Sequence, residues 1–257
     1  MATISQFMIS ESVKFFQKAY ELEFGLQCVN ESGYNPYEPC LFVGCYRPED
    51  TNRIFEHESQ RIVIWMGLDM WNADILNRML MFNKPVTHIA ISEEGYNHMN
   101  SHDIPAIYRR VPNTYTDYWV PTQLGTSVYC YAPNEKYGLS IAKSIESRLG
   151  NKYPFIFTND ANQYSWSQLR DLYSQSFVGI RPRQYDGCPA SVNEMGLMGR
   201  KTVSNVDNPA ALPWRNEDDI IEAIEEQSRN IGKKIVALPR VLRTLFRRET
   251  DFIRAEY

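Results

Sequence analysis

The sequence predicts an α/β fold in which two series of parallel strands and helices follow one another along the chain. The first observation is a set of short apolar runs that are continuous rather than alternating, as in strands covered on both faces of a parallel sheet. The second is that the strand–helix order restarts after 112–126, a stretch with two prolines, a glycine and several polar residues. This stretch is therefore the predicted linker between two halves.

The first half is predicted to open with a helix over 12–24, where apolar residues recur at three- and four-residue spacing. Strands and helices then alternate. The strands are expected at 40–45, 61–65 and 88–91, and the helices at 50–58 and 73–82.

The second half repeats this alternation. Its strands are expected at 127–131, 154–158, 177–181 and 201–204, and its helices at 137–149, at 165–173, from Pro189, and at 217–227. Two such series predict two Rossmann-like domains, 1–120 and 121–240, that face a central cleft and bind ligands at the carboxyl ends of their strands. The last helix, 241–257, is expected to pack back on the first domain.

Composition and motifs argue against several classes of protein. With 43% hydrophobic and 23% charged residues, the chain has enough apolar surface to close a core. No run approaches the roughly 20 apolar residues that span a bilayer, and the first residues lack a secretory pattern, so we expect a soluble cytoplasmic protein. Neither GxGxxG nor GxxxxGK(S/T) is present, which disfavours dinucleotide-dependent oxidoreductases and P-loop enzymes.

Residue types that bind metals are scattered along the chain. The four histidines show no metal-ligand spacing, and no DxD or similar acidic cluster follows a predicted strand, so we expect neither a metal nor another cofactor. The five cysteines form no CxxC pair, which indicates reduced thiols rather than a disulfide framework.

The charge of the chain is unevenly distributed. The net charge is −4, yet 229–257 holds eight basic and three acidic residues, a surplus of five positive charges. Such a segment is either the solvated face of a helix or a patch that meets phosphate on a membrane lipid or a nucleic acid. The sequence leaves both interpretations open.

The most informative segment is 177–203, FVGIRPRQYDGCPASVNEMGLMGRKTV. A buried strand brings Arg181 and Arg183 to its carboxyl end, and a turn through Asp186 leads to a helix that starts at Pro189. Free N–H groups, the helix dipole and both arginines favour a bound anion such as a diphosphate. Ser191 can donate its hydroxyl in the first turn of that helix.

This segment resembles that of retaining glycosyltransferases of the GT-B fold, of the family 4-like kind. In that family two acidic residues separated by seven are followed by a short helix and a strand. Asp186 and Glu194 have this spacing, and EMGLMGRKTV resembles the continuation E-A-x-A-x-G-x-P-V. The resemblance covers the second half of the chain well and the first half loosely.

The resemblance implies roles for individual residues. Glu194 would hold the ribose of a UDP- or GDP-sugar donor, Asp186 would lie beside the transferred sugar as a catalytic residue, and Ser191 and Gly187 would hold the phosphates. Two departures are visible. The first acidic residue is Asp where the family usually has Glu, and of the family's Arg–Lys phosphate clamp only Lys136 has a counterpart, so Arg181 or Arg183 would have to replace the arginine.

One residue of the first half also has a candidate role. In WMGLDMW, Asp69 follows a strand at a turn that resembles the point where these enzymes face acceptor and donor sugar. Asp69 is either a catalytic residue that orients or deprotonates the acceptor, or the N-cap of a helix.

The predicted function is transfer of a sugar from a nucleotide-sugar donor without a metal and with retention of configuration. The acceptor is a glycan, a lipid-linked glycan or a modified DNA base, and the short first domain suggests a compact viral or phage enzyme acting in the host cytoplasm. The alternative is a binding module for a nucleotide or sugar that has the fold without turnover.

Overall fold

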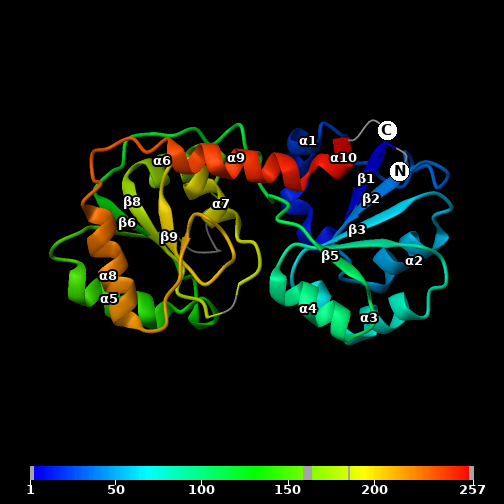
Figure 1. The fold of residues 1–257 in the computed structure, drawn as a ribbon, viewed down its shortest axis with the longest axis horizontal. Helices are drawn as coiled ribbons and strands as arrows, with labels where there is room; N and C mark the ends of the chain where they lie inside the picture. The colour runs from blue at the N-terminus through cyan, green and yellow to red at the C-terminus, as the bar shows by residue number, and fades with distance from the viewer. Residues whose placement is uncertain (1–2, 159–163, 185, 255–257) are drawn as a thin grey trace. The chain divides into compact units, whose positions relative to one another are not determined.

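The computed structural model describes residues 3–158, 164–184 and 186–254, which form two compact units. Met1–Tyr115 together with Leu245–Tyr257 make up the first unit, and Thr116–Thr244 the second. Each unit contains one five-stranded parallel sheet with helices packed against it (Figure 1). The division falls between Tyr115 and Thr116, whereas the sequence-based ranges divide at 120/121, inside the same linker.

The sheet of the first unit has its strands in the order in which they occur along the chain. They are β1 (Gln6–Ile9), β2 (Cys40–Val43), β3 (Arg61–Trp65), β4 (Thr87–Ala90) and β5 (Ala106–Tyr108). Neighbours pair in parallel, for example Phe42 of β2 with Val63 of β3. Because the order from β2 to β5 runs in one direction, the right-handed crossovers between these strands return over the same face of the sheet.

Helices cover both faces of this sheet. They are α1 (Gln17–Phe24), which follows β1, and the crossover helices α2 (Pro48–Glu56), α3 (Ala73–Leu80) and α4 (Glu93–Ser101). Ile54 of α2 and Met99 of α4 share a core with Trp65 on one face. On the other face Phe24 of α1 meets Phe7 of β1 edge to face, with ring centroids 6.4 Å apart.

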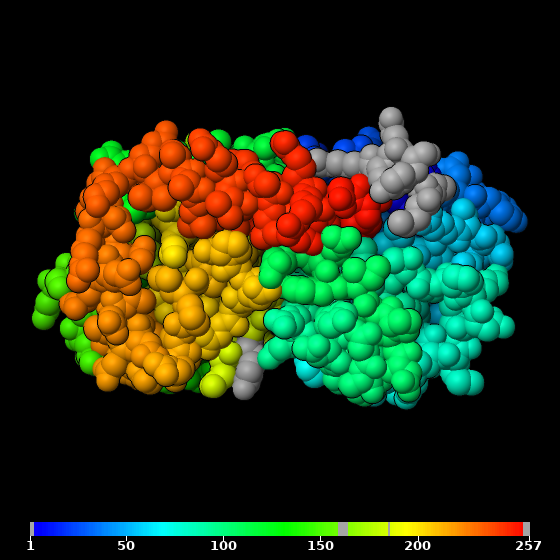
Figure 2. Space-filling view, viewed as in Figure 1, coloured from blue at the N-terminus to red at the C-terminus, as the bar shows by residue number. Residues whose placement is uncertain are grey.

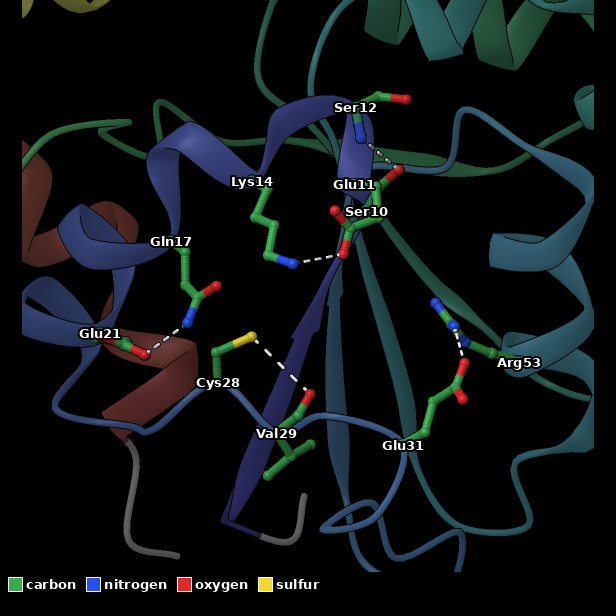
Figure 3. Close-up of polar contacts among 10 residues, drawn as sticks. All are labelled: Ser10, Glu11, Ser12, Lys14, Gln17, Glu21, Cys28, Val29, Glu31 and Arg53. Atoms are coloured by element: carbon green, nitrogen blue, oxygen red, sulfur yellow. Dashed lines mark hydrogen bonds and ion pairs between the residues drawn. The ribbon is translucent and has the colours of Figure 1, made fainter.

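The helix predicted over 12–24 begins as a tighter turn. A 3-10 helix (Glu11–Phe16) follows β1, and Val13 within it has a non-helical φ of −127°, so the α-helix proper starts only at Gln17. Ser10 accepts from the Ser12 N–H at 3.4 Å and Gln17 donates to Glu21 at 2.9 Å (Figure 3). Polar side chains therefore stabilise the start of the 3-10 helix and the α-helix that follows it.

The sheet of the second unit has a different topology. Its parallel strands lie in the order β7 (Phe155–Thr158), β6 (Ser127–Tyr131), β8 (Ser176–Ile180), β9 (Lys201–Val203) and β10 (Ala211–Leu212). Counted within the unit, this is the order 2-1-3-4-5 of a doubly wound sheet. The direction of the crossovers thus reverses at β6, and helices lie on both faces.

Two pairs of helices cover this second sheet. They are α5 (Leu139–Leu149) and α8 (Glu217–Ser228) on one face, and α6 (Trp166–Ser174) and α7 (Ala190–Leu197) on the other (Figure 1). Ile145 of α5 and Ile224 of α8 share a core with Val178 of β8. Helix α7 lies so close to β8 that a Cβ added at Gly179 would be 2.6 Å from the Met195 sulfur.

Helix α9 (Ala237–Glu249) belongs to the second unit as far as Thr244 and to the first from Leu245. Leu242 packs on α7, where a Cβ added at Gly196 would come within 2.5 Å of its side chain. Further along, Glu249 pairs with Arg109 of the first unit at 3.6 Å, and α10 (Asp251–Arg254) follows. The helix predicted at 241–257 therefore begins earlier, and 255–257 lie outside the described residues.

A fully buried arginine joins the linker to the second sheet. The Arg200 guanidinium donates to the carbonyl oxygens of Gln123 at 2.7 Å, Ser176 at 3.0 Å and Met198 at 2.6 Å. Burial lowers the pKa of Arg200 to about 10, which still leaves the group charged at neutral pH. Main-chain dipoles thus solvate this cation, and the end of the linker is fixed to the start of β8.

Several short elements were not predicted from the sequence. They are β1, α4, β5 and β10, of which the strands have only two to four residues. Helix α4 reads EEGYNHMNS and buries only Gly95 and Met99, so its apolar periodicity is weak. Within the described residues, none of the helices has both the length and the apolar character needed to cross a bilayer.

Acidification should destabilise the protein through His88. Its Nδ1 accepts from the Trp65 indole N–H at 3.1 Å, and burial lowers its pKa to about 4, against about 6.5 in an unfolded chain. The unfolded state binds the extra proton in this interval, so stability falls as the pH drops from about 6.5 towards 4, by at most ~1.4 kcal/mol per pH unit.

The measurement is the free energy of unfolding against pH for wild type and His88→Asn, whose amide oxygen can replace Nδ1. We expect the variant to be less stable at neutral pH but to have a shallower slope between pH 6.5 and 4. Equal slopes would show that His88 does not carry the effect.

Candidate functional site

The candidate site lies where the strand order of the second unit reverses. Strand β6 is flanked by β7 and β8, and the chain leaves β6 and β8 on opposite faces of the sheet. Loops that follow two such strands diverge at the carboxyl edge, which is where open α/β sheets bind ligands. The loops after β6 and β8 carry most of the residues that the sequence singled out.

The turn after β8 is organised by an ion-pair cluster. Arg181 is 8% exposed, and its Nε bonds to Oδ2 of Asp186, whose side chain is also 8% exposed. Arg183 places Nη1 at 3.6 Å from Oδ1 of the same carboxylate, which also accepts from the Gly187 N–H at 3.1 Å. Two cations and one anion meet here, so the cluster keeps a positive charge.

Two tyrosines, one at the end of β6 and one in the 3-10 helix that follows it, support these arginines. The Arg181 guanidinium lies 4.5 Å from the ring centre of Tyr131 and 5.1 Å from that of Tyr137, and Arg183 lies 5.1 Å from Tyr137. Burial acts to lower the pKa of Arg181, but the charge and hydrogen bond of Asp186 raise it. The arginines are therefore oriented by aromatic faces as well as by the carboxylate.

Helix α7 begins directly after this turn. Pro189 stands at its N-cap in extended conformation, and no side chain among the described residues caps its first N–H groups. Ser191, in the first turn, is 9% exposed, and its Oγ has no hydrogen-bond partner in the described part of the chain. Within the described residues, this uncapped helix start and buried hydroxyl have the free hydrogen-bond donors that an anion accepts from.

Glu194 lies one turn further along α7 and is buried. It is 5% exposed, and its Oε2 accepts from the Tyr173 hydroxyl at 2.8 Å. Burial, and then the charge of Glu194, raise the pKa of Tyr173 well above its ordinary value. The structure thus assembles Arg181, Arg183, Asp186, Gly187, Ser191 and Glu194 on one strand–turn–helix.

Lys136 is the member of the predicted set that stands apart. It is exposed, on the 3-10 helix Glu135–Tyr137 after β6, and its ammonium forms no ion pair within the described residues. Its loop nevertheless adjoins the β8 turn, because Gly138 lies against the carbonyl of Pro182. Lys136 is therefore brought to the same edge of the sheet without joining the ion-pair cluster.

Asp69 occupies a structural position in the first unit. Its carboxylate is fully buried and accepts backbone N–H groups from Cys45 at 3.0 Å, Met66 at 3.0 Å and Gly67 at 2.8 Å. Burial raises its pKa, and these hydrogen bonds oppose the rise. Asp69 is not the N-cap of a helix, because it lies within the 3-10 helix Leu68–Trp71 and Asn72 caps α3. Both of its oxygens are engaged by backbone donors of the turn after β3.

Sequence reasoning missed the aromatic partners of the site. Tyr131, Tyr137 and Tyr173 contact Arg181 or Glu194 from loops and helices distant in the sequence. Only the strand order brings them there, and a tyrosine at the end of a strand carries no signal of its own. The four histidines stay unassigned, and no group of three or more metal-binding side chains gathers within the described ranges.

The contact between Gly138 and Pro182 can be tested by substitution. Gly138 has a φ of 78°, and an added Cβ would lie 2.2 Å from the Pro182 carbonyl oxygen. Gly25 has a similar φ of 69° with nothing within 4 Å, so Gly25→Ala measures the backbone strain alone, about 1 kcal/mol. We expect Gly138→Ala to lower the free energy of unfolding by a further 1–3 kcal/mol, roughly the cost of overpacking. Equal losses in the two variants would contradict this geometry.

Comparison with known proteins identifies the fold. No family model matches the sequence, and no curated protein matches it either. The structure is similar to sucrose-phosphate synthase from Thermosynechococcus elongatus, with a TM-score of 0.59 and 13% identity over 94% of this chain and 75% of that one. It is also similar to TarM, with a TM-score of 0.53 and 12% identity. This match covers 87% of this chain but only about half, 52%, of the TarM chain. The chain therefore has the GT-B fold, with two parallel five-stranded sheets.

Proposed function

We propose that the protein is a glycosyltransferase that moves a sugar from a nucleoside diphosphate donor, UDP- or GDP-linked, to an acceptor. The observation that carries the proposal is the start of α7 beside the cationic β8 turn, where the described residues provide neither a side-chain cap nor a partner for the buried Ser191 hydroxyl. The fold it shares with a sucrose-phosphate synthase supports the same class of reaction.

Sugar transfer requires positive charge on one side of the breaking bond. Cleavage of the sugar–phosphate bond leaves negative charge on the diphosphate while the sugar becomes oxocarbenium-like. Arg181, Arg183 and the N–H groups of α7 are fixed where they can stabilise that charge. In this mechanism the chain itself provides the positive charge, and Lys136 adds to it from the adjoining loop.

Asp186 and Glu194 take the two acidic roles. We place Asp186 beside the transferred sugar, where its remaining lone pairs accept sugar hydroxyls while both arginines hold it in place. Glu194 accepts the ribose hydroxyls of the donor. Retention of configuration follows from the resemblance of this acidic pair to that of the retaining enzymes.

A module that binds a nucleotide sugar without turnover is the alternative. The decisive experiment incubates the purified protein with UDP- and GDP-sugars, screens binding by thermal shift, and follows release of the diphosphate with and without glycan, lipid-linked and DNA acceptors. Binding with turnover supports the transferase. Binding with no turnover over the whole panel supports the module, and absence of binding rejects both.

The Ser191 hydroxyl gives a direct test of the phosphate site. Because its hydroxyl has no partner among the residues that the structure describes, Ser191→Ala should leave the free energy of unfolding within about 0.5 kcal/mol of wild type. It should weaken binding of the nucleoside diphosphate about tenfold or more, since one hydrogen bond to a charged group is lost. Thr122→Val, which removes another buried hydroxyl without a partner, is the matched control and should bind as wild type does. Unchanged affinity in Ser191→Ala would remove the hydroxyl from the site.

The exposed surface of α9 and of the residues that precede it indicates what kind of acceptor the protein uses. The segment before α9 and α9 itself, coloured orange to red, lie at the surface in Figure 2. Lys233, Lys234, Arg240, Arg247 and Arg248 are exposed there, and Val236 and Val241 are 52% and 53% exposed. Leu242 and Phe246, on the other side of the helix, are buried. Exposed valines between cations favour an anionic membrane surface over a nucleic acid, so we propose a lipid-linked acceptor on such a surface.

Charge reversal tests this surface. Arg240→Glu combined with Arg247→Glu should lower co-flotation with vesicles that contain anionic lipid by about 30-fold or more, since each arginine contributes ~1 kcal/mol. The control, Lys14→Glu with Lys18→Glu, makes the same change in net charge on the exposed start of the first unit. Failure of the wild type to float with anionic vesicles at low salt would reject the membrane surface, and salt-dependent binding to duplex DNA in its place would favour the DNA acceptor.

A further inference from the structure

A tyrosine outside the strand–turn–helix motif contacts the carboxylate that is assigned to the ribose. Tyr173 lies in the last turn of α6, and Glu194 lies in α7. The Tyr173 hydroxyl donates to Oε2 of Glu194 at 2.8 Å. The two helices share one face of the sheet, so this hydrogen bond crosses between neighbouring elements.

Both partners are removed from solvent. Tyr173 is 1% exposed and Glu194 5% exposed. A buried carboxylate is costly unless hydrogen-bond donors surround it, and the phenol is one such donor. Burial and the charge of Glu194 raise the pKa of Tyr173 well above its ordinary value, so its hydroxyl remains a donor throughout the physiological range.

Aromatic rings hold Tyr173 in one orientation. The Tyr129 ring meets it edge to face with centroids 4.9 Å apart, and the Trp119 ring lies 5.6 Å away. Tyr129 is in turn fixed by a hydrogen bond of 2.8 Å between its hydroxyl and Oγ1 of Thr158, at the end of β7. Rings from the linker and β6 therefore leave the Tyr173 hydroxyl little freedom, and its direction fixes that of the carboxylate.

We propose that Tyr173 is a positioning residue, which holds the Glu194 carboxylate in the orientation that accepts the 2′- and 3′-hydroxyls of the donor ribose. This inference rests on the proposed function. A carboxylate has about four lone-pair sites, so Glu194 can bond to Tyr173 and to the ribose together. Tyr173 thus determines how strongly the site prefers a ribonucleotide over a nucleotide without these hydroxyls, although Tyr173 itself does not contact the nucleotide.

The test is a thermodynamic cycle between this side chain and the ribose hydroxyls. Dissociation constants are measured for uridine diphosphate and its 2′,3′-dideoxy analogue, with the guanosine pair in parallel, on wild type and Tyr173→Phe. We expect the wild type to prefer the ribose form about tenfold or more, as for hydrogen bonds to a charged group. In Tyr173→Phe this preference should fall to about two- to threefold, because the carboxylate loses its fixed direction.

The matched control is Tyr20→Phe in the first unit. Tyr20 is fully buried and its hydroxyl contacts the Met66 sulfur at 3.1 Å, so the variant also loses a buried hydroxyl. It should keep the wild-type preference. Wild-type preference in Tyr173→Phe would overturn the positioning role while leaving the proposed function intact. Absence of binding to every nucleoside diphosphate by the wild type would overturn the proposed function, and this inference with it.

A second comparison covers the case in which Tyr173→Phe does not fold. Glu194→Gln removes the charge, so the double variant Tyr173→Phe with Glu194→Gln loses the phenol without leaving a buried carboxylate behind. If Tyr173 acts through Glu194, the double variant folds and binds within about twofold of Glu194→Gln alone. A double variant that unfolds as readily as Tyr173→Phe, or that loses a further tenfold in affinity, would assign the hydroxyl another role and overturn the proposal.

Discussion

The buried ion pair between Arg181 and Asp186 is the contact on which the candidate site depends. It closes the turn between β8 and α7, and so fixes where the helix starts and which way its free N–H groups point. The same arginine rests on Tyr131 and Tyr137, which ties this turn to the loop after β6. Without the carboxylate, two arginines would repel each other in a confined space. With it, the turn is stable and still carries net positive charge.

The two units are built from similar strands and helices, but their sheets differ in strand order. In the second unit the strand order reverses beside β6, so adjacent loops separate and leave a binding position at the carboxyl edge of the sheet. In the first unit the order runs in one direction, and the turn after β3 folds its backbone donors around Asp69. The doubly wound topology is thus a physical reason to assign the donor to the second unit.

Sequence patterns predicted the long buried strands well. Runs such as RIVIW and SVYCY coincide with β3 and β6 because continuous apolar residues leave no alternative to a covered strand. β1 and β5 were missed although β4 and β9 are equally short. In β1 only three apolar residues follow Gln6, and in β5 none of the three residues is fully buried, so neither strand shows a long continuous apolar run. In the site, spacing singled out Arg181, Asp186 and Glu194, which are local in sequence. It did not indicate Tyr173 or Gly138, because their contacts depend on strand order and on the approach of separate loops.

The first unit is assembled from both ends of the chain, whereas the second is one uninterrupted segment. Synthesis proceeds from the N-terminus, so residues 3–115 emerge long before 245–254, which complete their unit. The segment translated second can therefore finish folding first, while the earlier one waits for its final helix. Long-range closure of this kind slows folding and lengthens exposure of apolar surface. Phe246 and Ile253, which are buried in the finished first unit, are consequently added only after the whole second unit has been synthesised.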